Sequence, residues 1–164
     1  MKFQMKYGSH LPILIKIISM TGGDVLELGT GLYSTPVLHW MCVPNRRHLW
    51  SYESKQSYYD LAKQYEDEFH RVILVTNWDD IDIERSWEVA FIDHEPAIRR
   101  KEDVRRLANF AKYIIIHDSD WRNEKHTHYK EIFPLFLYRH NYTFTRPHTT
   151  VLSNFVDLGK LQLC

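Results

Sequence analysis

The alternation of short apolar runs with helical stretches is the feature that most restricts the fold of this chain. Runs rich in β-branched and aromatic residues predict five strands, at 24–28, 48–53, 71–76, 88–93 and 112–117. Helices are predicted between them, at 35–41, 55–69 and 98–110. Strands that alternate with helices form βα units around a mostly parallel sheet. The sequence therefore predicts a Rossmann-like α/β fold, a three-layer sandwich with the sheet in the middle.

The two ends of the chain differ from this pattern. The apolar residues of the first part have helical spacing and Gly22-Gly23 follows them, so a helix is predicted at about 9–21. Lys16 interrupts the apolar run and no small-residue cleavage site follows, which argues against a signal peptide. Near the other end, a helix at 125–140 precedes two strand-like runs, 142–146 and 150–158, which predict a terminal hairpin. No linker or repeat is present, so one domain over 1–164 is expected, with a core at about 23–158.

Charge and cysteine content restrict the binding partners and the cellular compartment expected for the protein. Lys and Arg (21) balance Asp and Glu (21), so no net field favours nucleic acid or an anionic membrane. The two cysteines, Cys42 and Cys164, form neither a disulfide framework nor a CxxC pair, which favours a reducing, cytoplasmic location. The basic residues Arg99-Arg100-Lys101 and Arg105-Arg106 could contact phosphates, but Glu102 and Asp103 lie between them, which favours a solvated helix surface.

A glycine turn after the first predicted strand is the first candidate for a binding site. Gly29 and Gly31 allow the backbone to turn sharply and a ligand to lie against it, and the N–H groups of the following helix are free to bind an anion or a carboxylate. Ser34 occupies the position of the third glycine of the dinucleotide fingerprint, so a pyrophosphate is less favoured. Glu27, just before the turn, supplies an acidic group suited to a cationic amino-acid moiety.

Acidic residues also follow the second and third predicted strands. Glu53 ends the second strand, where a carboxylate can accept hydrogen bonds from both hydroxyls of a ribose, or can simply neighbour a helix N-cap. Trp78 and Asp79 follow the third strand and could stack on and hydrogen-bond an adenine, although a turn rich in Asn and Asp needs no ligand to explain it.

Together these motifs resemble the class I S-adenosylmethionine-dependent methyltransferases. The resemblance implies a seven-stranded, mostly parallel sheet ending in an antiparallel hairpin, with S-adenosylmethionine across the carboxyl ends of the strands. It places the methionine part of the cofactor against Glu27, Gly29, Thr30 and Gly31, and Ser34 is a further cofactor-binding residue. It also places the ribose at Glu53, the adenine at Trp78 and Asp79, and the methyl group beside Asp93.

The segments after the fourth and fifth predicted strands are similar to those of small-molecule O-methyltransferases. That resemblance implies Asp93 and Asp118 as oxygen ligands of Mg²⁺ or another divalent cation. His94 and Ser119 replace the usual glycine and asparagine of that pattern. Without a metal, Asp93, His94 and His117 are the candidate catalytic residues, with either histidine as general base; the alternative is that His117 is only a strand-end histidine.

The implied function is methyl transfer from S-adenosylmethionine to an oxygen or nitrogen nucleophile of a small-molecule or macromolecular acceptor. No inserted segment encloses an acceptor, which leaves open a large acceptor, a homodimer that completes the site, or no catalysis. A non-catalytic S-adenosylmethionine-binding partner subunit is therefore a second hypothesis. A nicotinamide-dependent oxidoreductase is a third, disfavoured by the missing third glycine and by the terminal hairpin.

Overall fold

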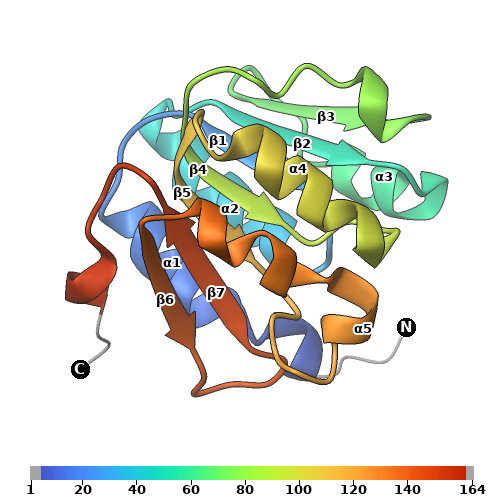
Figure 1. The fold of residues 1–164 in the computed structure, drawn as a ribbon. Coiled ribbons are helices and arrows are strands. Elements are labelled where there is room, and N and C mark those ends of the chain that lie inside the picture. The colour runs from blue at the N-terminus through green and yellow to red at the C-terminus, as the bar shows by residue number, and fades with distance from the viewer. Residues whose placement is uncertain (1–4, 162–164) are drawn as a thin grey trace.

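The computed structural model describes residues 5–161 and contains one seven-stranded sheet (Figure 1). The spatial order is β3-β2-β1-β4-β5-β7-β6. The first five strands are parallel, whereas β7 is antiparallel to both β5 and β6. The strands are β1 (Val25–Leu28), β2 (Leu49–Glu53), β3 (His70–Leu74), β4 (Trp87–Ile92), β5 (Ala111–Ile116), β6 (Tyr138–Tyr142) and β7 (Thr149–Ser153). The predicted Rossmann-like sheet with a terminal antiparallel pair is confirmed.

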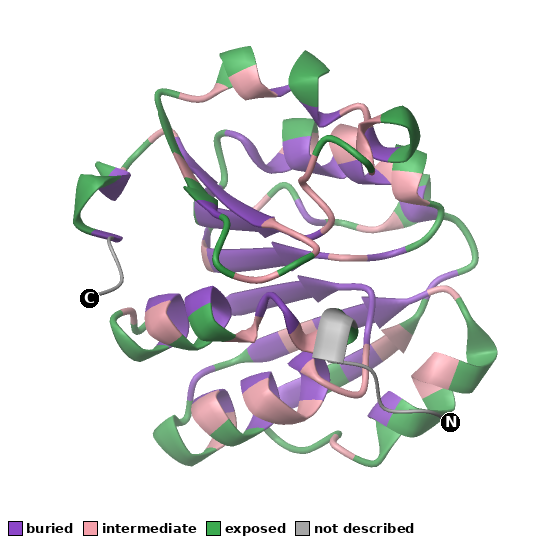
Figure 2. Cartoon of the chain, turned by 90° about the horizontal axis from the view of Figure 1, so that it is seen from below, coloured by how far each residue is buried: buried purple, intermediate pink, exposed green. Residues whose placement is uncertain are grey.

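Helices cover both faces of the sheet. They are α1 (Leu11–Ser19), α2 (Ser34–Cys42), α3 (Gln56–Lys63), α4 (Arg100–Leu107) and α5 (Glu124–Thr127). In Figure 1, α4 lies in front of the sheet and α1 and α2 lie behind it. Each face has its own apolar cluster, one that includes α4 and one that includes α1 and α2. Buried residues fill the central strands and exposed residues lie on the outer surfaces of the helices (Figure 2), as expected for a sheet that is covered on both sides. The edge strand β6 is largely exposed.

The N-terminal helix shows how the sequence pattern positions an element. Ile13, Leu14, Ile17 and Ile18 of α1 are all buried, because their spacing places them on the one face that packs on the sheet. His10 is the residue immediately before this helix, and its ring lies 4.7 Å from that of Phe91 in β4. The packing of α1 therefore brings the N-terminal segment to the end of β4.

The predicted helix at 125–140 is wrong. Only the single turn of α5 is α-helical there; short 3-10 turns follow at Tyr129–Glu131 and Phe133–Leu135. His128 ends α5 in the left-handed conformation, and Pro134 cannot donate the hydrogen bond that a continued helix requires. The strand β6 therefore begins at Tyr138, within the predicted helix, and the predicted hairpin is shifted toward the N-terminus. The helix predicted at 55–69 is also too long, because α3 ends at Lys63.

The expectations on membrane spans and on cysteines can be compared with the structure only for the residues that it describes. Within residues 5–161, no helix combines the length and apolar character needed to span a bilayer. Cys42 is a buried free thiol, whereas Cys164 lies outside the described residues, as do 1–4 and 162–163 of the predicted domain.

Candidate cofactor-binding site

A cavity of about 610 Å³ lies at the carboxyl ends of the parallel strands. Its volume is within the range of small-molecule sites, roughly 300–1,000 Å³. The residues that were predicted from the sequence and that line it are Gly29, Thr30, Gly31, Ser34, Glu53, Asp93, His94, His117 and Asp118. Glu27, Trp78 and Asp79 are not part of the lining. The strand ends therefore bring together most of the predicted site, because parallel strands end at the same edge of the sheet.

The glycine turn after β1 passes very close to the backbone after β4. Gly29 has a φ of +91°, and a Cβ atom added there would lie 2.5 Å from the backbone nitrogen of His94. A methyl group fits neither this conformation nor this space. At Gly31, by contrast, an added Cβ would meet only the Oγ of Ser34, at 3.5 Å, within the part of the chain that the structure describes. Gly29 is thus required by the fold, and Gly31 leaves the cavity open.

Glu53 connects the loop after β1 with the loop after β2. Its Oε2 accepts hydrogen bonds from the backbone nitrogen (2.9 Å) and the hydroxyl (3.2 Å) of Thr30. Its Oε1 accepts from the backbone nitrogens of Ser54 (2.8 Å) and Lys55 (2.7 Å). The side chain is nearly buried and borders the cavity. The two regions that the cofactor hypothesis requires to be adjacent are therefore in direct contact.

Glu27 stabilises the glycine turn indirectly, through hydrogen bonds to neighbouring side chains. It pairs in register with Ser51 of β2, whose hydroxyl donates to Oε2 at 2.6 Å. The hydroxyl of Thr35 lies 3.0 Å from Oε1 and also accepts a hydrogen bond from the backbone nitrogen of Gly31. Glu27 is completely buried, and this burial raises its pKa to about 7. Its contact with the turn therefore runs through Thr35.

The buried carboxyl of Glu27 predicts a pH-dependent stability. Below pH 4.5 the carboxyl is protonated in both the folded and the unfolded chain. Between pH 4.5 and about 7 only the unfolded chain loses the proton, so the free energy of unfolding falls as the pH rises. The total loss is about 3 kcal/mol, at roughly 1.4 kcal/mol for each pH unit. Glu27→Gln removes this ionisation.

Urea denaturation of wild type and Glu27→Gln between pH 4.5 and 8 measures the effect. We expect the stability of wild type relative to the variant to decrease by about 3 kcal/mol over this range and then to level off. A difference that stays constant with pH contradicts the assignment.

Trp78 and Asp79, predicted to contact an adenine, are engaged elsewhere. The indole of Trp78 is 7% exposed, and its Nε1 donates to the carbonyl oxygen of Glu95 at 2.9 Å. Its ring centroid is 4.1 Å from that of His94. Asp79 forms an ion pair with Arg99. In this structure both residues brace the loops beside the cavity.

His94 contributes to the lining, but its imidazole is buried. The residue is 1% exposed and Nε2 lies 3.0 Å from a carboxylate oxygen of Asp103. Burial lowers the pKa of the ring, although Asp103 acts in the opposite direction. The ring packs against Trp78 and α4, which does not present it to an acceptor in the cavity as the predicted general base.

Asp93 lies between two positively charged groups. Its Oδ1 is 2.9 Å from Nη1 of Arg100, and its Oδ2 is 3.1 Å from Nδ1 of His117. Burial would raise the pKa of Asp93, but the neighbouring His117 and Arg100 outweigh it and lower the pKa to about 2. Asp93 is therefore ionised at neutral pH.

The hydrogen bonds of His117 assign a proton to each ring nitrogen. The hydroxyl of Ser9 donates to the carbonyl oxygen of Pro147 (2.7 Å), so it must accept from Nε2 of His117 (2.9 Å). The ionised Asp93 accepts from Nδ1. Burial would lower the pKa of His117, but Asp93 outweighs this and raises it. In this arrangement His117 has no lone pair with which to act as the predicted base.

The side chains around Asp118 do not fit the predicted Mg²⁺ site. Nη1 of Arg100 is 3.1 Å from Oδ2 of Asp118 and 2.9 Å from Oδ1 of Asp93. A guanidinium thus occupies the space between the two carboxylates and supplies the positive charge there. The interpretation of Arg100 as part of a solvated surface is wrong, because the residue is 3% exposed.

The comparisons with known proteins bear on the fold. No family model matches the chain, and no curated protein matches it in sequence. Among solved structures, cofactor-bound Rv0187 from MTB superposes with a TM-score of 0.69 at 14% identity, covering 95% of this chain and 83% of that one. The O-methyltransferase TomG from Streptomyces achromogenes, in complex with SAM, has a TM-score of 0.63 at 14% identity, covering 93% and 81%. The N-terminal domain of human METTL16 has a TM-score of 0.67 at 11% identity, covering 95% and 72%.

The chain has the fold of the class I methyltransferases. This fold accounts for the placement of β7, which inserts between β5 and β6 and runs antiparallel to both. A dinucleotide-binding dehydrogenase fold would continue with a further parallel strand at this edge. The strand order therefore differs from the one that the nicotinamide-dependent oxidoreductase hypothesis requires.

Three residues that line the cavity or contact its lining were not predicted from the sequence as part of the site: Ser9, His10 and Arg100. Ser9 contacts His117 across a separation of 108 residues, which no local pattern indicates. Arg100 did have a signal, because it shares the buried helix face of Val104 and Leu107 at helical spacing.

Proposed function

We propose that the chain binds S-adenosylmethionine in the cavity and transfers its methyl group to an oxygen or nitrogen nucleophile. The observation that carries this proposal is the direct contact between Glu53 and Thr30 at the wall of the cavity. It places a glycine turn and a carboxylate at adjacent strand ends, the arrangement that an adenosyl amino acid requires. The methyltransferase fold of the chain and the SAM bound to TomG support the same cofactor.

In this proposal the cofactor lies along the carboxyl ends of β1, β2 and β4. Gly29, Thr30, Gly31 and Ser34 lie near its methionine part. Glu53 accepts a hydrogen bond from a ribose hydroxyl. The hydroxyl of Thr30 has a second acceptor, the carbonyl oxygen of Tyr58 at 3.3 Å, so it can turn away and free a lone pair of Glu53 for the sugar.

Asp93 is the residue we place beside the methyl group. The transfer is an in-line displacement: the acceptor atom bonds to the methyl carbon as the carbon–sulfur bond breaks, the sulfonium becomes the neutral thioether of S-adenosylhomocysteine, and the proton of the acceptor passes to solvent. The ionised Asp93 is held by Arg100 and His117 and provides a fixed negative charge near the sulfonium. Its low pKa makes it a poor base, so its contribution is to position the reactants.

The first test of this proposal is product formation. The full chain is incubated with S-adenosylmethionine and a panel of phenol, amine, peptide and nucleic-acid acceptors, and S-adenosylhomocysteine is measured by mass spectrometry. We expect its formation to depend on at least one acceptor and to be lost in Gly31→Arg. Binding of the cofactor without product from any acceptor favours the non-catalytic partner subunit instead. A homodimer that completes the site stays a prediction, tested by sedimentation of the same protein.

A further inference from the structure

His10 is a buried polar side chain at the edge of the cavity. It is 2% exposed and borders the cavity, yet neither ring nitrogen has a hydrogen-bond partner among residues 5–161. Its ring lies against Phe91 and at 4.8 Å, edge-on, from that of His117. A buried polar group without a partner is unfavourable unless something else occupies its nitrogen.

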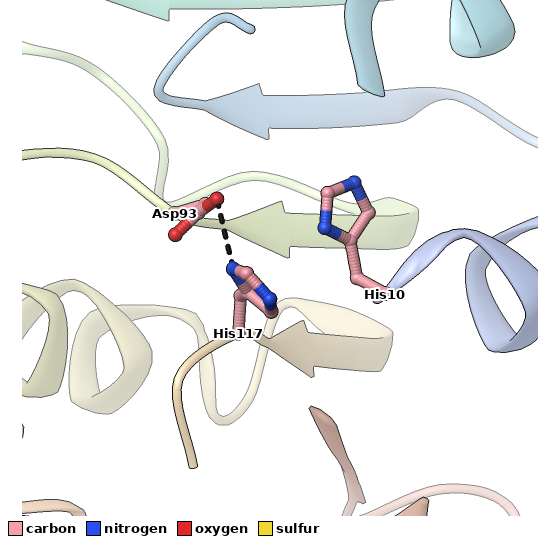
Figure 3. Close-up of side chains that lie close together, drawn as sticks. All are labelled: His10, Asp93 and His117. Carbon is pink, nitrogen blue, oxygen red and sulfur yellow. Dashed lines mark hydrogen bonds and ion pairs between the residues drawn. The ribbon is translucent and has the colours of Figure 1, made fainter. Parts of the chain in front are cut away.

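The neighbouring side chains supply the donors that a metal ion would require. One ligand atom each from His10, Asp93 and His117 lies within 4.8 Å of the others, and the three side chains converge at the ends of β4 and β5 (Figure 3). Nδ1 of His117 and Oδ2 of Asp93 are 3.1 Å apart. Two ligands about 2.1 Å from one ion are separated by roughly 3.0–3.4 Å, so this pair already has the required spacing.

The surroundings hold two of these ligands in place. Arg100 binds Oδ1 of Asp93 and leaves Oδ2 directed at His117. Ser9 accepts from Nε2 of His117 and is itself fixed by Pro147. In metal sites, residues that hydrogen-bond to a ligand on the side away from the ion fix the orientation of the ligand's imidazole or carboxylate.

We propose that His10, Asp93 and His117 bind a divalent transition-metal ion of the Zn²⁺ class. Two imidazoles and one carboxylate favour such an ion over Mg²⁺, which prefers oxygen ligands. On binding, the ion replaces the proton between Nδ1 of His117 and Asp93, and this proton passes to solvent. Three protein ligands leave coordination positions open toward the cavity. The site shares Asp93 with the predicted Asp93–Asp118 pair but uses the other carboxylate oxygen, Oδ2, because Arg100 holds Oδ1. It does not depend on the proposed methyl transfer.

Titration of the chelator-treated full chain with Zn²⁺ alone tests the site. We expect one equivalent to bind by calorimetry, and Co²⁺ at the same site to give visible absorption bands. His10→Phe keeps a ring against Phe91 but removes the nitrogen ligand, so we expect Zn²⁺ affinity to fall more than tenfold. His126→Phe, at an exposed position, is the matched control and should bind as wild type does.

A second measurement needs no variant and covers the case in which His10→Phe fails to fold. Nitrogen chemical shifts of the histidine rings are followed in wild type during the Zn²⁺ titration. We expect the rings of His10 and His117 to shift together at one equivalent. The absence of stoichiometric binding, shifts confined to other histidines, or wild-type affinity in a folded His10→Phe overturns the proposal.

Discussion

Gly29→Ala is expected to lower the free energy of unfolding by about 3 kcal/mol or more. The added methyl group would lie 2.5 Å from the backbone nitrogen and 2.6 Å from the Cα of His94. Both are backbone atoms at the end of β4, which cannot move aside without disturbing the sheet. The φ of +91° adds strain, because residues other than glycine rarely adopt this backbone conformation. Backbone strain and overpacking each contribute about 1–3 kcal/mol in other proteins.

Gly22→Ala provides the matched control. Among the atoms of residues 5–161, none lies within 4 Å of a methyl group added there, so we expect a change of less than about 1 kcal/mol. Urea denaturation of the three proteins under the same conditions measures both effects. Equal stability of Gly29→Ala and wild type contradicts the described path of the turn after β1.

Gly31→Arg is expected to weaken the binding of S-adenosylhomocysteine at least 100-fold, a loss of about 3 kcal/mol. Gly31 lines the cavity, and only the Oγ of Ser34 lies near an added Cβ. The fold therefore accepts a side chain here, whereas a long one takes the space proposed for the methionine part of the ligand.

Gly31→Ala is the control that distinguishes blocking of the cavity by the long arginine side chain from the mere loss of the glycine. Its methyl group makes an ordinary contact of 3.5 Å with Ser34, so we expect folding and affinity close to those of wild type. Thermal unfolding of both variants checks the fold before the titrations. An unfolded Gly31→Arg protein would contradict the open space described at this position.

The sheet could be predicted because its signals are local. Each parallel strand is a short run of apolar residues, and all four residues of β1, for example, are buried. The failure at 125–140 has an equally local cause. A left-handed residue at His128 and the proline at 134 interrupt a segment whose polar and aromatic residues otherwise suit a helix.

Part of the site could be predicted for a topological reason. Residues that follow parallel strands meet at one edge of the sheet, so the order of the strands alone brings Gly31, Glu53 and Asp93 to one cavity. The direction of a side chain is harder to predict. Glu27 precedes the turn by only two residues, yet as a strand residue it points, with Ser51, into the face covered by α2.

The remaining contacts depend on packing between distant segments. His10 reaches the ends of β4 and β5 only because α1 packs across the sheet, and Arg100 reaches Asp93 only because α4 begins beside it. Helical spacing indicates that Arg100 is buried, but it does not indicate the contact with Asp93. No local pattern indicates the position of His10. Both residues were therefore missed, although they surround the carboxylate that the sequence did single out.

Calorimetric titration of S-adenosylhomocysteine into the folded, full-length chain tests the central claim most directly. The account predicts saturable binding with one ligand per chain, preserved in Gly31→Ala and absent in Gly31→Arg at the same concentrations. No heat of binding to the folded wild-type protein, or equal binding to all three proteins, would contradict it.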